Sequence, residues 1–365
     1  MKSIAFIPTF GNRPYSLVGR GAIIADFKEG LEHPEGHPNR AFIFTGQRGM
    51  GKTALLLEFA DIGEKMGYIP VRVSATETML DDILQTIQII GSKTMKAETR
   101  KVKSVNAGAF GFSFGLTFTD DVKENYGFRI KLSLLADELA KQGKGILFLI
   151  DEVQSNTPEM REFASAYQQL IGDGKNIAIA MAGLPASLSA VLNDKVLTFL
   201  NRSRKVQLEP LQSGEVGAFY AERFRAENKK VPPDILEKIV QATKGYPYQL
   251  QLIGYYILKY SAGSDKIDEQ IASLAIRSAK HEMIDTVLVT ALAPLSENDL
   301  SFLKAMSKDK EISKVADVRE RLKKTDSYVQ QYRRRLMDAG VIASRKRGTV
   351  EYSLPYLGEY LRGEL

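Results

Sequence analysis

Short apolar runs alternate with longer amphipathic runs from about Phe42 to Leu208. The short runs are typical of buried strands, and the segments between them follow the period of helices. Strands that alternate with helices usually form a parallel sheet covered on both faces. The pattern therefore predicts an α/β fold. The strands are predicted at residues 41–45, 68–74, 145–150, 177–182 and 205–208.

The pattern changes after residue 210. From Ser213 to Ser261 the periodicity is helical, and Pro233 can begin a helix because its φ is fixed and its missing N–H is not needed there. A third unit begins near Pro294, where LSENDLSFLKAM places a serine cap before an amphipathic helix. We predict three domains, at residues 1–210, 211–292 and 293–365.

Composition excludes several kinds of chemistry. The chain has 365 residues, no cysteine and three histidines, which excludes disulfides and cysteine catalysis and disfavours a histidine metal cluster. The N-terminal run MKSIAFIPTF is too short for a secretion signal, and no later segment is long and apolar enough to span a membrane. We expect a cytoplasmic protein. The net charge is +6, and residues 296–365 hold 15 Lys and Arg against 11 Asp and Glu, so most of the basic excess lies at the C-terminus.

A glycine-rich loop follows the first predicted strand, in the sequence FIFTGQRGMGKTALL. It matches GxxxxGK[ST] between a strand and a helix, where backbone N–H groups and the helix N-terminus can surround phosphates. Lys52 would reach the β- and γ-phosphates, and Thr53 would hold Mg²⁺. We expect ATP or ADP as the ligand. The residues expected to contact it are Gly46, Gln47, Arg48, Gly49, Met50, Gly51, Lys52, Thr53 and Ala54.

Two adjacent acids, Asp151 and Glu152, follow the strand predicted at 145–150. Successive side chains on a strand point in opposite directions, so Asp151 can face the metal ion while Glu152 polarises the attacking water. A helix N-cap acid after a core strand is the simpler alternative for Asp151. The two motifs are about 100 residues apart, which leaves room for a strand between them in the sheet and argues against a small-molecule kinase.

Together these motifs resemble the AAA+ and STAND branch of P-loop ATPases, in particular bacterial ATP-binding proteins distantly similar to archaeal origin-recognition and helicase-loader ATPases. The resemblance covers nearly the whole chain and identifies the second unit as a helical lid. Val18-Gly19-Arg20 looks like the segment that packs on adenine in this family, and a plain turn is the alternative. No polar side chain ends the strand at 177–182, where the family carries a sensor, so we assign none.

Two further assignments rest on the resemblance. Gly245-Tyr246-Pro247 looks like the glycine-x-proline of STAND proteins, which implies that Pro247 contacts the nucleotide, although Pro247 can also simply begin a helix. Arg202 and Arg204 precede the strand at 205–208, where related ATPases have an arginine finger. By resemblance, Arg204 would act in catalysis on a neighbouring subunit's nucleotide, in a homo-oligomer formed through the nucleotide interface. Solvated arginines at a strand edge are the alternative.

An apolar stripe lies outside these motifs. Phe110, Phe112, Phe114, Leu116 and Phe118 alternate with small residues, which predicts a strand with one apolar face. Such a strand usually packs on its own domain, and an exposed one would form a partner surface.

The C-terminal unit resembles a winged helix. Helical patterns at 297–307, 313–323 and 325–339 precede two predicted strands around a basic turn. On the third helix, Val329 and Leu336 fall on one side and polar residues on the other. The polar side suits base edges and phosphates, and the basic turn suits the backbone or minor groove. The expected DNA contacts are Ser327, Gln330, Gln331, Arg334, Arg345, Lys346 and Arg347.

The sequence therefore predicts a Mg²⁺-dependent ATPase with catalytic residues Lys52, Glu152 and Arg204. We expect a switch or loader that binds duplex DNA through the winged helix. The alternative is a STAND-like signalling ATPase whose winged helix makes protein contacts. A lid without a sensor arginine favours a slow switch over a fast motor.

Overall fold

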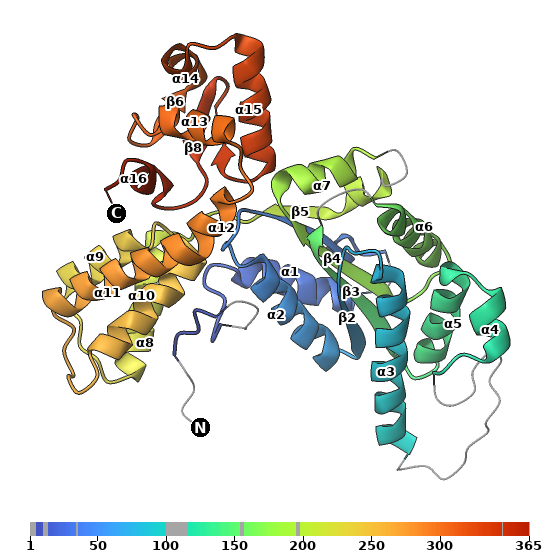
Figure 1. The fold of residues 1–365 in the computed structure, drawn as a ribbon. Helices are drawn as coiled ribbons and strands as arrows, with labels where there is room; N and C mark the ends of the chain where they lie inside the picture. The colour runs from blue at the N-terminus through green and yellow to red at the C-terminus, as the bar shows by residue number, and fades with distance from the viewer. Residues whose placement is uncertain are drawn as a thin grey trace.

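A computed structural model describes residues 5–9, 14–33, 36–99, 116–153, 157–194, 198–344 and 346–364 of the chain. Three parts follow one another in space as in sequence (Figure 1). A sheet flanked by helices comes first, a helical unit lies beside it, and a C-terminal unit is joined to the helical unit through α12.

Five parallel strands form the central sheet in the order β2-β3-β4-β1-β5. The predicted α/β class is therefore confirmed, and β4 is the strand that lies between the two motif-bearing strands β1 and β3. β3 runs three residues beyond the prediction because Val153 still pairs with Gly183 after a register shift. The strands are β1 (Ala41–Thr45), β2 (Tyr68–Ser74), β3 (Gly145–Val153), β4 (Ile177–Gly183) and β5 (Arg204–Gln207).

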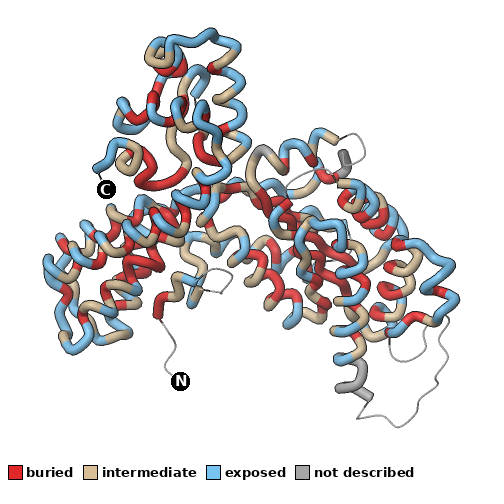
Figure 2. The backbone as a smooth tube through the Cα atoms, in the orientation of Figure 1, coloured by how far each residue is buried: buried red, intermediate tan, exposed pale blue. Residues whose placement is uncertain are grey.

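Helices cover both faces of this sheet, and the inner strands β3, β4 and β1 are mostly buried (Figure 2). α1 and α2 lie on one face, where Phe27 stacks on Phe59 with ring centroids 3.6 Å apart. α3, α5 and α6 lie on the other. On β3, Leu149 belongs to the core on the α2 face and Ile150 to the core on the α3 face. The helices are α1 (Gly21–Glu32), α2 (Lys52–Lys65), α3 (Met79–Thr99), α4 (Asp120–Asn125), α5 (Phe128–Ala140), α6 (Pro158–Gly172) and α7 (Pro185–Leu192).

The helical unit consists of α8 (Ser213–Ala226), α9 (Pro233–Ala242), α10 (Pro247–Tyr260) and α11 (Glu269–Met283). α9 begins at Pro233, as predicted. A π-helical turn at Ile284–Leu288 continues α11 into α12 (Val289–Leu292). Residues near the N-terminus complete this unit, because Phe6 is buried against Phe219, Tyr220 and Phe224 of α8. The domain boundary predicted at residue 210 assigns Phe6 to the first domain and so separates it from α8, on which it packs.

The C-terminal unit combines the four helices α13 to α16 with a small antiparallel sheet of order β6-β8-β7. The prediction of a helix from residue 313 is wrong at its start, because residues 312–314 pair with β8 as a third strand. The prediction that Val329 and Leu336 share the apolar face of α15 is confirmed, since both are buried. The elements are α13 (Glu297–Met306), β6 (Ile312–Lys314), α14 (Val315–Leu322), α15 (Asp326–Asp338), β7 (Ile342–Ala343), β8 (Thr349–Tyr352) and α16 (Leu357–Leu361).

The apolar stripe is described only at its end. Leu116 and Phe118 are buried in the core on the α3 face of the sheet, in keeping with a segment that packs on its own domain. Phe110, Phe112 and Phe114 lie outside the described residues.

Among the described residues, no helix is both long enough and apolar enough to cross a membrane.

Candidate nucleotide site

The glycine-rich loop connects β1 to α2 at the carboxyl end of the sheet. Gly49 and Gly51 have φ values of 79° and 84°, in the left-handed region where a side chain is strained. Gly51 caps α2, which begins at Lys52. Glycine at these positions therefore lets the loop turn tightly and direct the N-terminus of α2 towards the site.

Lys52 lies folded along the loop. Its Nζ donates to the carbonyl oxygens of Gly46, at 2.7 Å, and Gln47, at 2.9 Å. Burial lowers the pKa of the Lys52 ammonium to about 8, although the negative charge of Asp151 opposes the shift. A buried cation of this kind gains most from a ligand that brings negative charge, such as a phosphate.

Thr53 and Asp151 meet across the site, as the sequence predicts. The Thr53 hydroxyl donates to Asp151 Oδ2 at 2.6 Å, and so joins the start of α2 to the end of β3. Mg²⁺ prefers oxygen ligands and is usually bound by one or two protein oxygens together with substrate phosphates and water. The chemistry and proximity of these two groups fit such an ion. Bound there, it would offset the negative charge that develops on the phosphates.

Glu152 has a strained backbone, with φ at 52°. Its N–H donates to Asp151 Oδ1 at 2.8 Å, and the pairing of β3 with β4 is irregular at this point. A residue other than glycine is held in this conformation only where its surroundings impose it, and such positions cluster at functional sites. Asp151 and Glu152, although adjacent on β3, both line one cavity.

A cavity of about 830 Å³ joins these groups. It has the size and mixed polarity of a site for a small molecule. The segment Ser16 to Arg20, the loop and the start of α10 form its walls. Of the predicted site residues, Arg48, Gly49, Met50, Gly51, Lys52, Thr53, Ala54, Asp151, Glu152 and Pro247 line it, whereas Gly46 and Gln47 contribute the carbonyl oxygens that hold Lys52.

Several lining residues were missed by the sequence interpretation. Tyr248 and Gln251 follow Pro247 on α10, and Thr286 and Thr290 come from the helical run that leads to the C-terminal unit. Only Tyr248 could have been suspected, because it is adjacent to Pro247. Ser187 of α7 lines the cavity beyond β4, whose carboxyl end carries no polar side chain.

Arg204 lies away from the glycine-rich loop of its own chain. It pairs with Phe42 near the start of β1, at the end of the sheet opposite the loop. Its guanidinium donates to Asn39 Oδ1 at 2.9 Å and forms an ion pair with Asp26. These contacts tie Arg204 to its own chain, and its action on a neighbouring subunit's nucleotide stays a prediction.

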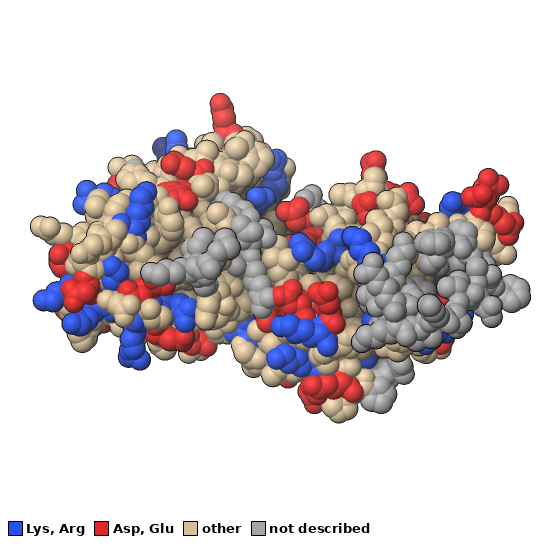
Figure 3. Space-filling model, turned by 90° about the horizontal axis from the view of Figure 1, so that it is seen from below, with Lys and Arg blue, Asp and Glu red and all other residues tan. Residues whose placement is uncertain are grey.

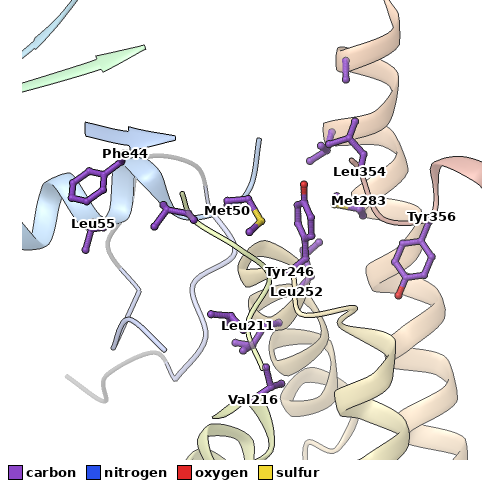
Figure 4. Packing of buried hydrophobic residues seen from close by; sticks show 14 of the residues in the cluster. Phe44, Met50, Leu55, Leu211, Val216, Tyr246, Leu252, Met283, Leu354 and Tyr356 are labelled. Atoms are coloured by element: carbon purple, nitrogen blue, oxygen red, sulfur yellow. The ribbon is translucent and has the colours of Figure 1, made fainter. Parts of the chain in front are cut away.

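The C-terminal unit is connected to the loop at two points, the first of them through Tyr246 at the start of α10. The Tyr246 ring lies so close to Gly49 that a Cβ there would be 3.1 Å from it, and the Tyr246 hydroxyl donates to the Ser353 carbonyl at 2.9 Å. Figure 4 shows Tyr246 between Met50 and Leu354. At the second point, a Cβ added to Gly340 would be 2.7 Å from Gln47 Oε1.

Comparison with known proteins agrees with this geometry. Residues 25–253 match a family described as an ATPase domain predominantly from Archaea. The chain belongs to this family. It is an ATP-binding protein and an ATP-hydrolysing enzyme. Residues 285–361 match a second family, described as a domain of unknown function (DUF8462).

Solved structures share the fold of this ATPase over almost its whole length. The Walker-type ATPase PabY2304 of Pyrococcus abyssi is 18% identical, with a TM-score of 0.69 over 96% of this chain and 97% of that one. The Aeropyrum pernix ORC2 protein, in its ADPNP–ADP complexes, is 17% identical, with a TM-score of 0.65 over 98% and 96%. No curated protein matches the chain.

The lowered pKa of Lys52 predicts that ATP binding weakens at alkaline pH. Below pH 8 the free lysine is charged and can pair with phosphate. As pH rises through about 8 the free protein loses this proton, whereas bound phosphate favours the charged form. The Kd for ATP, measured by titration from pH 7 to 9.5, should rise up to about tenfold per pH unit above that point. Lys52→Ala should bind weakly with no inflection near pH 8. A Kd constant across this range in the wild-type protein would contradict the role of Lys52.

Proposed function

We propose that this ATPase is a nucleotide-governed switch that binds duplex DNA through its C-terminal unit. In the nucleotide site, Lys52 contacts the phosphates, Thr53 and Asp151 hold Mg²⁺, and Glu152 orients the attacking water. The hydrogen bond between Thr53 and Asp151 and the strained backbone of Glu152 support these roles. Pro247 and the segment Ser16 to Arg20 bind the rest of the nucleotide, a role supported by their place in the cavity wall.

The observation that carries the switch is the contact between the phosphate-binding loop and the C-terminal unit. Tyr246 touches Gly49 with its ring and Ser353 with its hydroxyl. Gln47 lies against Gly340 directly after α15, and its Oε1 is buried without a donor among the described residues. A change in the loop on nucleotide binding or cleavage would therefore disturb groups that position α15.

The DNA proposal rests on the form and charge of the C-terminal unit. Three helices and a three-stranded antiparallel sheet are the parts of a winged helix, and α15 takes the place of its recognition helix. The proposed contacts Ser327, Gln330, Gln331, Arg334, Lys346 and Arg347 are all exposed, and Arg345 lies outside the described residues. Figure 3 shows the side of the molecule away from the C-terminal unit, where acidic and basic side chains are interspersed without a broad basic patch.

Neighbouring arginines support the proposed recognition face. Arg333 donates to Gln330 Oε1 at 3.3 Å and to Ser344 at 3.0 Å, which links α15 to the segment after β7. Arg335 pairs with the buried carboxylate of Asp299 at 2.9 Å. These two side chains brace α15, and Arg334 between them has no such tie among the described residues. It is therefore available to a phosphate.

One observation favours the STAND-like alternative, in which the C-terminal unit makes protein contacts. Glu359 of α16 binds Lys244 at 2.7 Å and Lys280 at 3.4 Å, and both ammonium groups lie over the Tyr356 ring. The unit is thus already tied to the lid of its own chain. DNA binding decides between the two candidates.

The roles proposed for Lys52 and Glu152 predict that their variants lose different steps, one ATP binding and the other ATP turnover. Lys52→Ala should abolish tight ATP binding, because the lysine contacts phosphates of the bound substrate. Glu152→Gln should keep ATP affinity and stop turnover, because the glutamate serves mainly the water. Binding would be measured by calorimetry and turnover by phosphate production. Glu162→Gln, an exposed matched change on α6, should alter neither. Lost ATP affinity in Glu152→Gln would refute the assigned base.

The DNA proposal predicts a change in salt dependence. Each lost phosphate contact lowers the slope of log affinity against log salt by roughly 0.9. Replacing Arg334, Lys346 and Arg347 together by Ala should therefore reduce the slope by about two to three. Gln331→Ala should instead relax sequence preference, because an amide can pair with an adenine edge without carrying charge.

The matched control removes three exposed charges elsewhere, by changing Lys28, Lys65 and Lys259 to Ala. It should leave the salt slope unchanged. If the wild-type protein shows no salt-sensitive duplex binding with either ATP or ADP bound, the DNA proposal fails and the STAND-like alternative replaces it.

A further inference from the structure

Strand β2 carries a cation where its neighbours are apolar. Tyr68 belongs to the core on the α2 face of the sheet, and Ile69 and Val71 belong to the core on the α3 face. By the alternation of side chains along a strand, Arg72 and Ser74 face α2. The burial pattern agrees, because Val71 is fully buried whereas Arg72 and Ser74 are exposed.

The register of the sheet brings these two residues to the metal-binding end of β3. Arg72 pairs with Leu149 and Ser74 with Asp151. Paired residues on adjacent strands are about 4.8 Å apart, and positions two residues apart on one strand are separated by about 7 Å. Since Leu149 and Asp151 lie on the same face as Arg72, its long side chain can extend towards the Asp151 carboxylate.

A second cavity lies at this point. It has a volume of about 200 Å³ and is formed by the first turns of α2 and the ends of β2 and β3. Its polar wall consists of Arg72, Ser74, Thr53 and Asp151, and Leu56 and Leu149 are among its apolar residues. Thr53 and Asp151 line the nucleotide cavity as well, so the two cavities adjoin at the proposed Mg²⁺ site.

Arg72 forms no ion pair with a described residue, although the Asp151 carboxylate lines the same cavity. Within the described ranges, its guanidinium makes no hydrogen bond, ion pair or ring contact, and the Ser74 hydroxyl makes no hydrogen bond. Asp151 Oδ2 already accepts from Thr53, and the donors of the Arg72 guanidinium stay available to an external anion. Its planar fork of donors suits tetrahedral oxyanions.

We propose that Arg72 and Ser74 form a subsite for the inorganic phosphate that ATP cleavage releases. This inference rests on the proposed function of the adjoining site. When water attacks the γ-phosphorus, the bond to the β–γ bridging oxygen breaks and ADP keeps that oxygen. The water supplies the fourth oxygen of the phosphate; one of its protons passes to Glu152 and the other stays on the phosphate. The new phosphate moves past Thr53 and Asp151 into the small cavity, where Arg72 and Ser74 hold it before release.

An arginine solvated at an edge strand is the simpler account of Arg72, and it makes a different prediction. A solvated side chain would leave phosphate binding unchanged when it is removed. If Arg72 forms a phosphate subsite, its removal weakens the binding of inorganic phosphate. The binding of ADP stays intact, because the ADP contacts lie in the other cavity.

The test is the binding of inorganic phosphate to the protein saturated with ADP and Mg²⁺, measured by calorimetry. Arg72→Ala should weaken phosphate binding at least tenfold and raise the inhibition constant of phosphate in steady-state ATP hydrolysis to the same extent. The affinity for ADP should stay within twofold. Ser74→Ala should show a smaller effect in the same direction. Arg129→Ala, which removes an exposed arginine on α5, is the matched control and should change nothing.

Arg72→Gln removes the charge with less loss of chain length and serves where the alanine variant does not fold. Phosphate affinity within twofold of wild type in either folded variant overturns the subsite. So does a wild-type ADP complex that binds no phosphate at millimolar concentration while the enzyme turns over ATP. A failure of the proposed nucleotide site would give a different result from a failure of the subsite, because the wild-type protein would then bind no ATP at all.

Discussion

The arrangement of this ATPase depends on the close approach of Tyr246 to Gly49. The ring fits against the phosphate-binding loop because glycine has no side chain there, and its hydroxyl reaches the Ser353 carbonyl in the C-terminal unit. Burial also raises the pKa of the phenol, so it remains a hydrogen-bond donor at any physiological pH. One buried side chain thus touches the loop, belongs to the helical unit and binds the C-terminal unit.

Apolar and charged contacts reinforce that junction. A single hydrophobic core extends from Phe44 beneath the loop, through Met50 and Leu211, to Leu354 in the C-terminal unit. At its rim, Glu359 accepts from Lys244 and Lys280, and these interactions outweigh burial and lower the pKa of the Glu359 carboxyl. Because well-packed interfaces shift between discrete arrangements instead of deforming continuously, a small movement of the loop can be passed to α15.

Local sequence patterns were sufficient to predict the strands of the parallel sheet and the residues of the phosphate site. Hydrophobic runs located all five strands of the parallel sheet, and the two motifs brought Thr53 and Asp151 together because both follow strands at the same edge. Long-range packing was not accessible in this way. The ion pair of Arg204 with Asp26, the seat of Phe6 in the helical unit and the contact of Gln47 with Gly340 join residues far apart in sequence. The strand at 312–314 was missed because three residues carry too little periodicity, and it forms only by pairing with β8.

The most direct test of the coupling is amide hydrogen exchange of residues 340–361, compared between the ADP complex and the complex with a non-hydrolysable ATP analogue. The account predicts that protection of this segment differs between the two complexes in the wild-type protein. It predicts that Tyr246→Phe, which removes only the hydroxyl bound to Ser353, reduces that difference, and that Tyr255→Phe, an exposed matched change on α10, preserves it. Identical exchange in both complexes of the wild-type protein would contradict the account.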